Sequence, residues 1–137
     1  MNERDIVFRE RLVSLVAEIK ERAGNDRRIR TLLGAYASRM SKDAGARNWA
    51  DLKARADEST YDSMLNMFQR EGANAAKAED IKTVSALEVL GVSLIARYQN
   101  QADLLPGVTF LDKYIAESEI MAARANAQFI PVKRSRQ

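Results

Sequence analysis

The sequence has no cysteine and no histidine among its 137 residues. Without cysteine, disulfides, thiolate metal sites and thiol nucleophiles are excluded. Without histidine, the chain lacks the commonest general base and the commonest transition-metal ligand. Catalysis would therefore have to rest on carboxylates, Lys, Tyr or Ser/Thr, and a bound metal would have to be Mg²⁺ or Ca²⁺ on oxygen ligands.

Long apolar runs are missing as well. The most apolar stretch, residues 84–96, is interrupted by Ser85, Glu88 and Ser93, whereas a membrane-spanning helix needs about 20 apolar residues. The first ten residues carry acidic side chains and have no apolar core like that of a secretory signal. We therefore expect a soluble protein of cytoplasmic type, with no membrane span.

Proline occurs only twice, and apolar residues recur at helical spacing over nearly the whole chain. This pattern predicts an all-α fold, a single bundle of about five or six helices over residues 1–130, followed by a short basic tail at 131–137. Gly72 is expected to end a helix, and 73–78 to be either a linker or the frayed first turn of the next helix. Residues 104–107 are expected to form a loop, and Pro131 to end the last helix. The expected helices lie at about 4–23, 25–45, just after 48, 59–72, 79–102 and 110–129.

The fifth expected helix, about 79–102, has apolar residues over most of its circumference. A helix that is apolar nearly all round is enclosed on several sides. We therefore expect it to be the central helix of the bundle, or to pack against a second subunit. Gly91 within it costs roughly 1 kcal/mol relative to alanine, which predicts a close helix crossing at that point.

Glu88 is the exceptional acid, because it lies among apolar positions of that central helix. An unpaired charge there is costly. Either Glu88 pairs with an arginine of a neighbouring helix or lies at the bundle edge, or it contacts a ligand or a subunit. The candidate partner interface therefore consists of Glu88, Val89, Leu90 and Gly91.

No constellation predicts an enzyme. Glu117 and Glu119 are close in sequence but face different directions on a helix, and other acids lie near helix starts, where they complement the helix dipole. The six glycines are isolated, so phosphate-binding and dinucleotide-binding loops are absent. We expect no catalytic residues, no metal and no cofactor. The aromatic residues Trp49, Tyr98 and Tyr114 are expected in the core.

Basic residues give the clearest functional indication. Three arginines fall in the first turn of the second expected helix, where free backbone N–H groups could bind an anion. Helical register places Arg28, Arg39 and Lys42 on one stripe, although Glu21 and Asp26 lie close enough to neutralise part of it. Nucleic acid would be held through its phosphates, without sequence readout. The candidate anion-binding set is Arg27, Arg28, Arg30, Arg39, Lys42, Lys133, Arg134 and Arg136.

Charge divides the chain into blocks, with net +5 over residues 1–55, −5 over 56–130 and +3 over 131–137. Such blocks indicate contact with a polyanion or head-to-tail packing of copies. The leading hypothesis is a non-enzymatic helical interaction or assembly protein that docks on partner chains, particularly copies of itself. A structural or accessory component of a larger particle, such as a phage virion, fits the size and composition. The alternative is a nucleic-acid-binding accessory protein.

Overall fold

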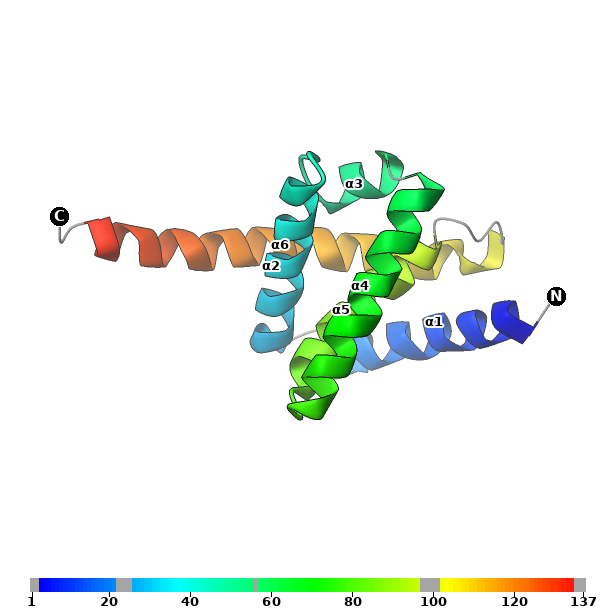
Figure 1. Cartoon of the computed structure of the whole chain (residues 1–137). Helices are drawn as coiled ribbons and strands as arrows, with labels where there is room; N and C mark the ends of the chain where they lie inside the picture. Colours follow the sequence, from blue (N-terminus) through cyan, green and yellow to red (C-terminus); the bar gives the residue numbers. More distant parts are fainter. Residues whose placement is uncertain (1–2, 22–25, 56, 97–101, 135–137) are drawn as a thin grey trace.

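The computed structural model describes residues 3–21, 26–55, 57–96 and 102–134, and over these residues the fold is all-α, as predicted (Figure 1). The described chain contains no strand. Helices α2, α4, α5 and α6 cross one another to form the body, while α1 and the short α3 cover its sides. The helices are α1 (Glu3–Glu21), α2 (Arg27–Asp43), α3 (Trp49–Arg55), α4 (Glu58–Lys77), α5 (Ile81–Ala96) and α6 (Leu105–Arg134), with a 3₁₀ turn, η2 (Ala102–Leu104), before α6.

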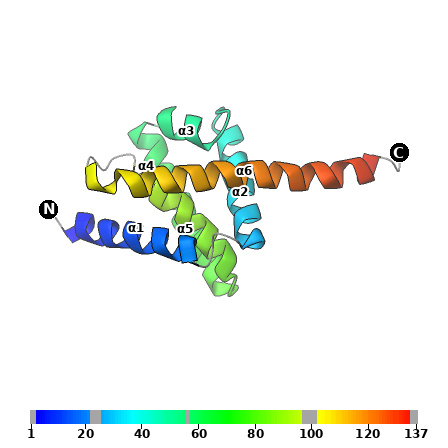
Figure 2. The same ribbon diagram turned by 180° about the vertical axis from the view of Figure 1, so that it is seen from behind.

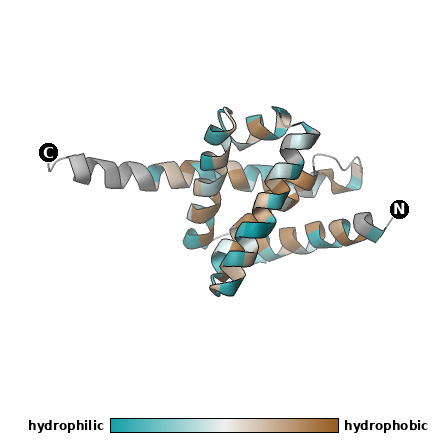
Figure 3. Ribbon diagram, in the orientation of Figure 1, coloured by the Kyte–Doolittle hydropathy of each residue, from teal (hydrophilic) through white to brown (hydrophobic). Residues whose placement is uncertain are grey.

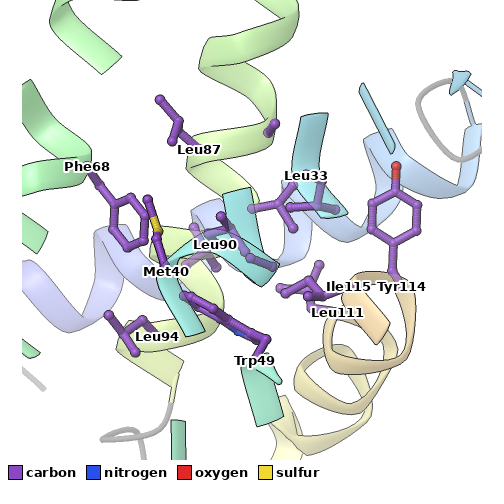
Figure 4. Packing of buried hydrophobic residues seen from close by; sticks show 14 of the residues in the cluster. Leu33, Met40, Trp49, Phe68, Leu87, Leu90, Leu94, Leu111, Tyr114 and Ile115 are labelled. Atoms are coloured by element: carbon purple, nitrogen blue, oxygen red, sulfur yellow. The ribbon is translucent and has the colours of Figure 1, made fainter. Parts of the chain in front are cut away.

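Helix α5 is the centre of the bundle, as predicted, but it is shorter than the expected 79–102. It runs from Ile81 to Ala96, and residues 97–101, with Tyr98 among them, lie outside the described residues. It packs most extensively against α2 and α4 and also contacts α6 and α1. Leu90 and Leu94 are fully buried. Figure 4 shows them among Met40 of α2 and Trp49 of α3, with side chains of α4 and α6 completing the cluster. The described part of the central helix is therefore covered on several sides by helices of its own chain.

The closest helix crossing is that of α2 with α6, and it lies at Gly34. A Cβ placed on Gly34 would be 2.5 Å from the carbonyl carbon of Ser118 and closer still to its oxygen. The two backbones therefore touch, which only glycine permits. The predicted close crossing at Gly91 is wrong, because nothing lies within 4 Å of a Cβ placed there.

The predicted end at Gly72 is also wrong, because α4 passes Gly72 and continues to Lys77, so that 73–77 are neither a linker nor the first turn of α5. Alanine and lysine dominate this stretch, and both are strong helix formers that outweigh one glycine. The chain turns instead at Glu79, whose φ of 59° is left-handed. Asp80 then begins α5 by accepting hydrogen bonds from the backbone N–H and the hydroxyl of Thr83.

Both prolines lie inside α6, contrary to the predicted loop at 104–107 and the predicted end before Pro131. Pro106 occupies the first turn, where a helix has no use for its missing N–H. The helix continues through Pro131 to Arg134, since an interior proline removes a hydrogen bond without having to end a helix. Residues 131–134 of the predicted tail are thus helical, and 135–137 lie outside the described residues.

Helix α6 is 30 residues long, and its C-terminal part extends beyond the body (Figures 1 and 2). Helix α2 crosses it near Ser118 and Ala122. Past that crossing no other described helix runs alongside. We call residues 120–134 of α6 the arm. In both views the arm lies at one end of the molecule, and the first turns of α1 lie at the other.

Candidate protein interface

Helices α1, α4 and α5 leave an apolar groove between them. Its first part, about 470 Å³, lies between α1 and α5. Its second part, about 280 Å³, lies between α4 and α5 and shares Val92 and Ile95 with the first. We call the two parts together the α5 groove. Its lining is Glu3, Val7, Phe8, Arg11, Leu65, Phe68, Gln69, Gly72, Val84, Leu87, Glu88, Gly91, Val92 and Ile95.

The groove is the side on which α5 remains open. Val7 is 60% exposed, and Figure 3 shows apolar residues along α1. Gly91 contributes no side chain, so the floor is open to close approach by another backbone. Clusters of exposed apolar residues with polar neighbours are typical of protein interfaces.

Only half of the predicted interface lies on this surface. Glu88 and Gly91 line the groove, whereas Val89 and Leu90 are 2% and 0% exposed. The prediction is wrong for Val89 and Leu90, because they point into the core of their own chain. Because this helix is apolar nearly all round, its sequence does not indicate which of its sides faces the core and which faces outward.

Glu88 forms an ion pair with an arginine of a neighbouring helix, the first of the alternatives above. It accepts a hydrogen bond from Nε of Arg11 at 2.7 Å and another from Nη2 of the same guanidinium. Hydrogen bonding to Glu88 raises the pKa of Arg11, which also donates to Glu18. The pair links α1 to α5. The groove lining therefore carries two carboxylates, those of Glu3 and Glu88, and one guanidinium, that of Arg11.

The arm continues an apolar stripe that begins on the bundle. Tyr114 is buried against the body, while Met121 and Ala125 are only partly covered. The sequence continues the stripe with Phe129 and Val132, at the spacing of one helix face. Met121 and Ala125 line the hollow beside Arg27 of α2, and Ile120 next to them is 54% exposed.

At the start of α2, the chain's own carboxylate occupies part of the predicted anion site. Asp26 accepts a hydrogen bond from the backbone N–H of Ile29 at 3.0 Å, and its other oxygen accepts one from Lys82 at 2.9 Å. The bond from Ile29 and then that from Lys82 lower the pKa of Asp26. Asp26 is thus a charged N-cap that takes up one of the backbone donors an anion could use, and anion binding by the basic residues around it stays a prediction.

The predicted basic residues do not form one surface. Arg27 and Arg30 meet Arg124 of α6 around a hollow of about 540 Å³ that also contains Glu117. Arg30 is held in place, with its guanidinium 4.8 Å from the ring centre of Tyr114 and 3.5 Å from Glu117. The hollow therefore offers Arg27 and Arg124 as exposed cations.

The rest of the predicted basic set lies elsewhere. Arg39 stacks on Tyr36 at 5.0 Å and pairs with Glu71 at 3.7 Å. Arg28 and Lys42 are exposed on the outer face of α2. Lys133 and Arg134 belong to the arm helix, their side chains lying outside the described residues together with the whole of Arg136.

A further pocket, about 250 Å³ between α3 and α6, has no counterpart in the sequence predictions. Its Lys53 is only 12% exposed and pairs with Asp112 at 2.9 Å. Trp49 donates its indole N–H to Ser93, whose hydroxyl donates to the same carboxylate. These internal partners identify the cluster as a tie between α3, α5 and α6. Its residues come from segments far apart in the chain, so no local motif could have indicated it.

Glu119 lies at the edge of that pocket and accepts the backbone N–H of Trp49 at 3.2 Å. Burial raises the pKa of its carboxyl, while the bond from Trp49 acts in the opposite direction. Glu117 points to Arg30 instead. The prediction that the two acids face different directions is confirmed, and they cannot act as a catalytic pair.

Within the described ranges, no three acidic side chains gather as metal ligands would, and no helix is both long and apolar enough to span a bilayer. Neither protein-family models, nor curated proteins, nor solved structures provide a match to this chain.

Proposed function

We propose that this chain is a non-enzymatic helical assembly component that associates with copies of itself through its arm. The observation that carries the proposal is the arm itself. An isolated helix of about fifteen residues is marginal in water, and most helical stability in proteins comes from packing of an apolar face. The arm has such a face, yet no described helix of its own chain covers it beyond the α2 crossing.

The α5 groove supports the same proposal. It combines an apolar lining with exposed Val7 on α1. The chain therefore has both an uncovered helix and an uncovered apolar surface, as a subunit of an assembly requires. By contrast, the polar cluster beside Trp49 is satisfied internally, which favours a binding function over catalysis.

The first test replaces Ala125 with aspartate. A charge on the arm stripe must be desolvated when the stripe docks, so we expect Ala125→Asp to weaken self-association at least about tenfold. Light scattering over a dilution series of the full chain measures the effect. The matched control is Ala123→Asp, on the exposed side of the same helix, which should associate like wild type.

Thermal unfolding followed by circular dichroism should show that the bundle of both variants unfolds like that of wild type. A wild-type chain that stays monomeric at the highest attainable concentration would overturn the proposal. If the two variants associate equally strongly, the arm stripe is not the surface through which the chain associates.

A second candidate function, polyanion binding, is favoured by one specific observation. Arg27 and Arg124 approach the same hollow from two helices, and both are exposed. A phosphate chain could lie across this hollow and continue along Arg28 and Lys42 on α2. Such binding would be electrostatic and would not read sequence.

We expect the double variant Arg27→Glu, Arg124→Glu to lose retention of single- or double-stranded DNA and RNA in a low-salt gel shift. Wild-type binding should fall steeply as salt is raised. Arg47→Glu is the matched control, since Arg47 is 87% exposed but lies away from the hollow. If wild type retains none of these nucleic acids at low salt, the polyanion function is excluded.

A further inference from the structure

We infer that the arm of one copy docks in the α5 groove of the next copy, so that the chain assembles head to tail. This inference rests on the proposed self-association and adds the surface that receives the arm. The occupant of the groove is thus the arm of a second copy of this chain.

The placement of the two surfaces requires the contact to be between molecules. The arm continues a single long helix away from the body, while the α1 part of the groove lies toward the opposite end (Figures 1 and 2). A straight helix cannot fold back to reach it. A contact between two different surfaces of identical chains is heterologous, and it propagates into a ring or an open filament.

The groove has the form that an amphipathic helix requires. Helices α1 and α4 provide its two walls, and α5 provides its floor. The stripe Met121, Ala125, Phe129 and Val132 has the spacing with which helices present anchors to apolar grooves. At 1.5 Å per residue, the stripe from Met121 to Val132 and the floor from Val84 to Ile95 are each about 16 Å long, so the lengths match.

Small residues lie on both surfaces at positions that permit close packing. Gly91 lies on the floor of the groove, with nothing within 4 Å of the place its Cβ would take. Ala125 is the small residue of the arm stripe. A helix backbone can approach such a floor closely, as α6 approaches α2 at Gly34.

Charge favours the groove over pairing of two arms. Residues 120–137 contain four basic residues and no acidic one, so two paired arms would bring eight like charges together. The groove lining instead carries Glu3 and Glu88 against Arg11. Opposite charges attract at low ionic strength and are screened by salt, so this assembly should weaken as salt is raised.

The test is a complementation experiment on full-length chains. Val7→Asp places a charge in the groove, and Ala125→Asp places one on the arm. We expect each variant alone to be monomeric. Mixed in equal amounts, they should form a one-to-one dimer and stop there, because only the arm of the Val7→Asp chain and the groove of the Ala125→Asp chain remain intact. Light scattering gives the mass.

The matched control is Val13→Asp. Val13 is 61% exposed, as Val7 is 60%, but it does not line the groove, so this variant should assemble like wild type. If Val7→Asp also assembles like wild type, the groove is not the recipient, while self-association through the arm stands. If the mixture stays monomeric although wild type assembles, head-to-tail docking is likewise overturned.

Discussion

Replacing Gly34 with alanine is expected to destabilise the fold by roughly 3 kcal/mol, at or above the upper end of the usual cost of overpacking. The new methyl group would meet the main chain of α6 at Ser118, 2.5 Å from the carbonyl carbon. A flexible side chain could rotate away, but a helix backbone cannot. Helices α2 and α6 would have to separate along the most extensive helix contact of the bundle.

Gly91→Ala is the matched control, since Gly91 is also a helix-interior glycine. Nothing lies within 4 Å of its Cβ position, so alanine should stabilise the monomer by about 0.5–1 kcal/mol through helix propensity. Urea unfolding, at concentrations where the chain is monomeric, measures both variants. A Gly34→Ala chain as stable as wild type would show that the described α2–α6 crossing is wrong.

Truncating Leu94 to alanine is expected to lower the free energy of unfolding by about 2–5 kcal/mol, the usual range for a fully buried leucine. Leu94 is 0% exposed on α5 and lies in the cluster with Trp49 and Phe68 (Figure 4). Removing its branched methyl groups leaves a cavity that α2, α4 and α6 cannot fill without separating from their other contacts.

Ile81→Ala provides the comparison within the same helix. Ile81 is 74% exposed, so the change should fall within about 0.5 kcal/mol of wild type. Urea midpoints of the two variants therefore distinguish an enclosed helix from one that lies on a surface. Similar losses in both, or a loss below about 1 kcal/mol for Leu94→Ala, would contradict the central position of α5.

Features that depend on local spacing could be predicted from the sequence. The apolar period indicated the helices, and the apolar circumference of residues 79–102 indicated the central one. Glu88 among apolar neighbours required a partner, and Arg11 is that partner. The same spacing also predicted that Glu117 and Glu119 would diverge.

Features that depend on which helices meet could not be predicted. The close crossing is at Gly34 instead of Gly91, because α2 happens to pair with α6 there. Asn25 and Asp26 are both good N-cap residues, so a cap at this point could be predicted, whereas the bond from Lys82 of α5 to Asp26 could not. Val89 and Leu90 were placed on a surface because their helix has no polar side to orient it.

The most direct test of head-to-tail docking of the arm uses the absence of native cysteine. Two single-cysteine chains, Val7→Cys and Ala125→Cys, are mixed and treated with a short bismaleimide, and the products are identified by mass spectrometry. We predict that the main product joins the two different chains, and that Val13→Cys in place of Val7→Cys gives little of it. Cross-linking of Ala125→Cys only to itself, or no joined product at concentrations where wild type assembles, would contradict the account.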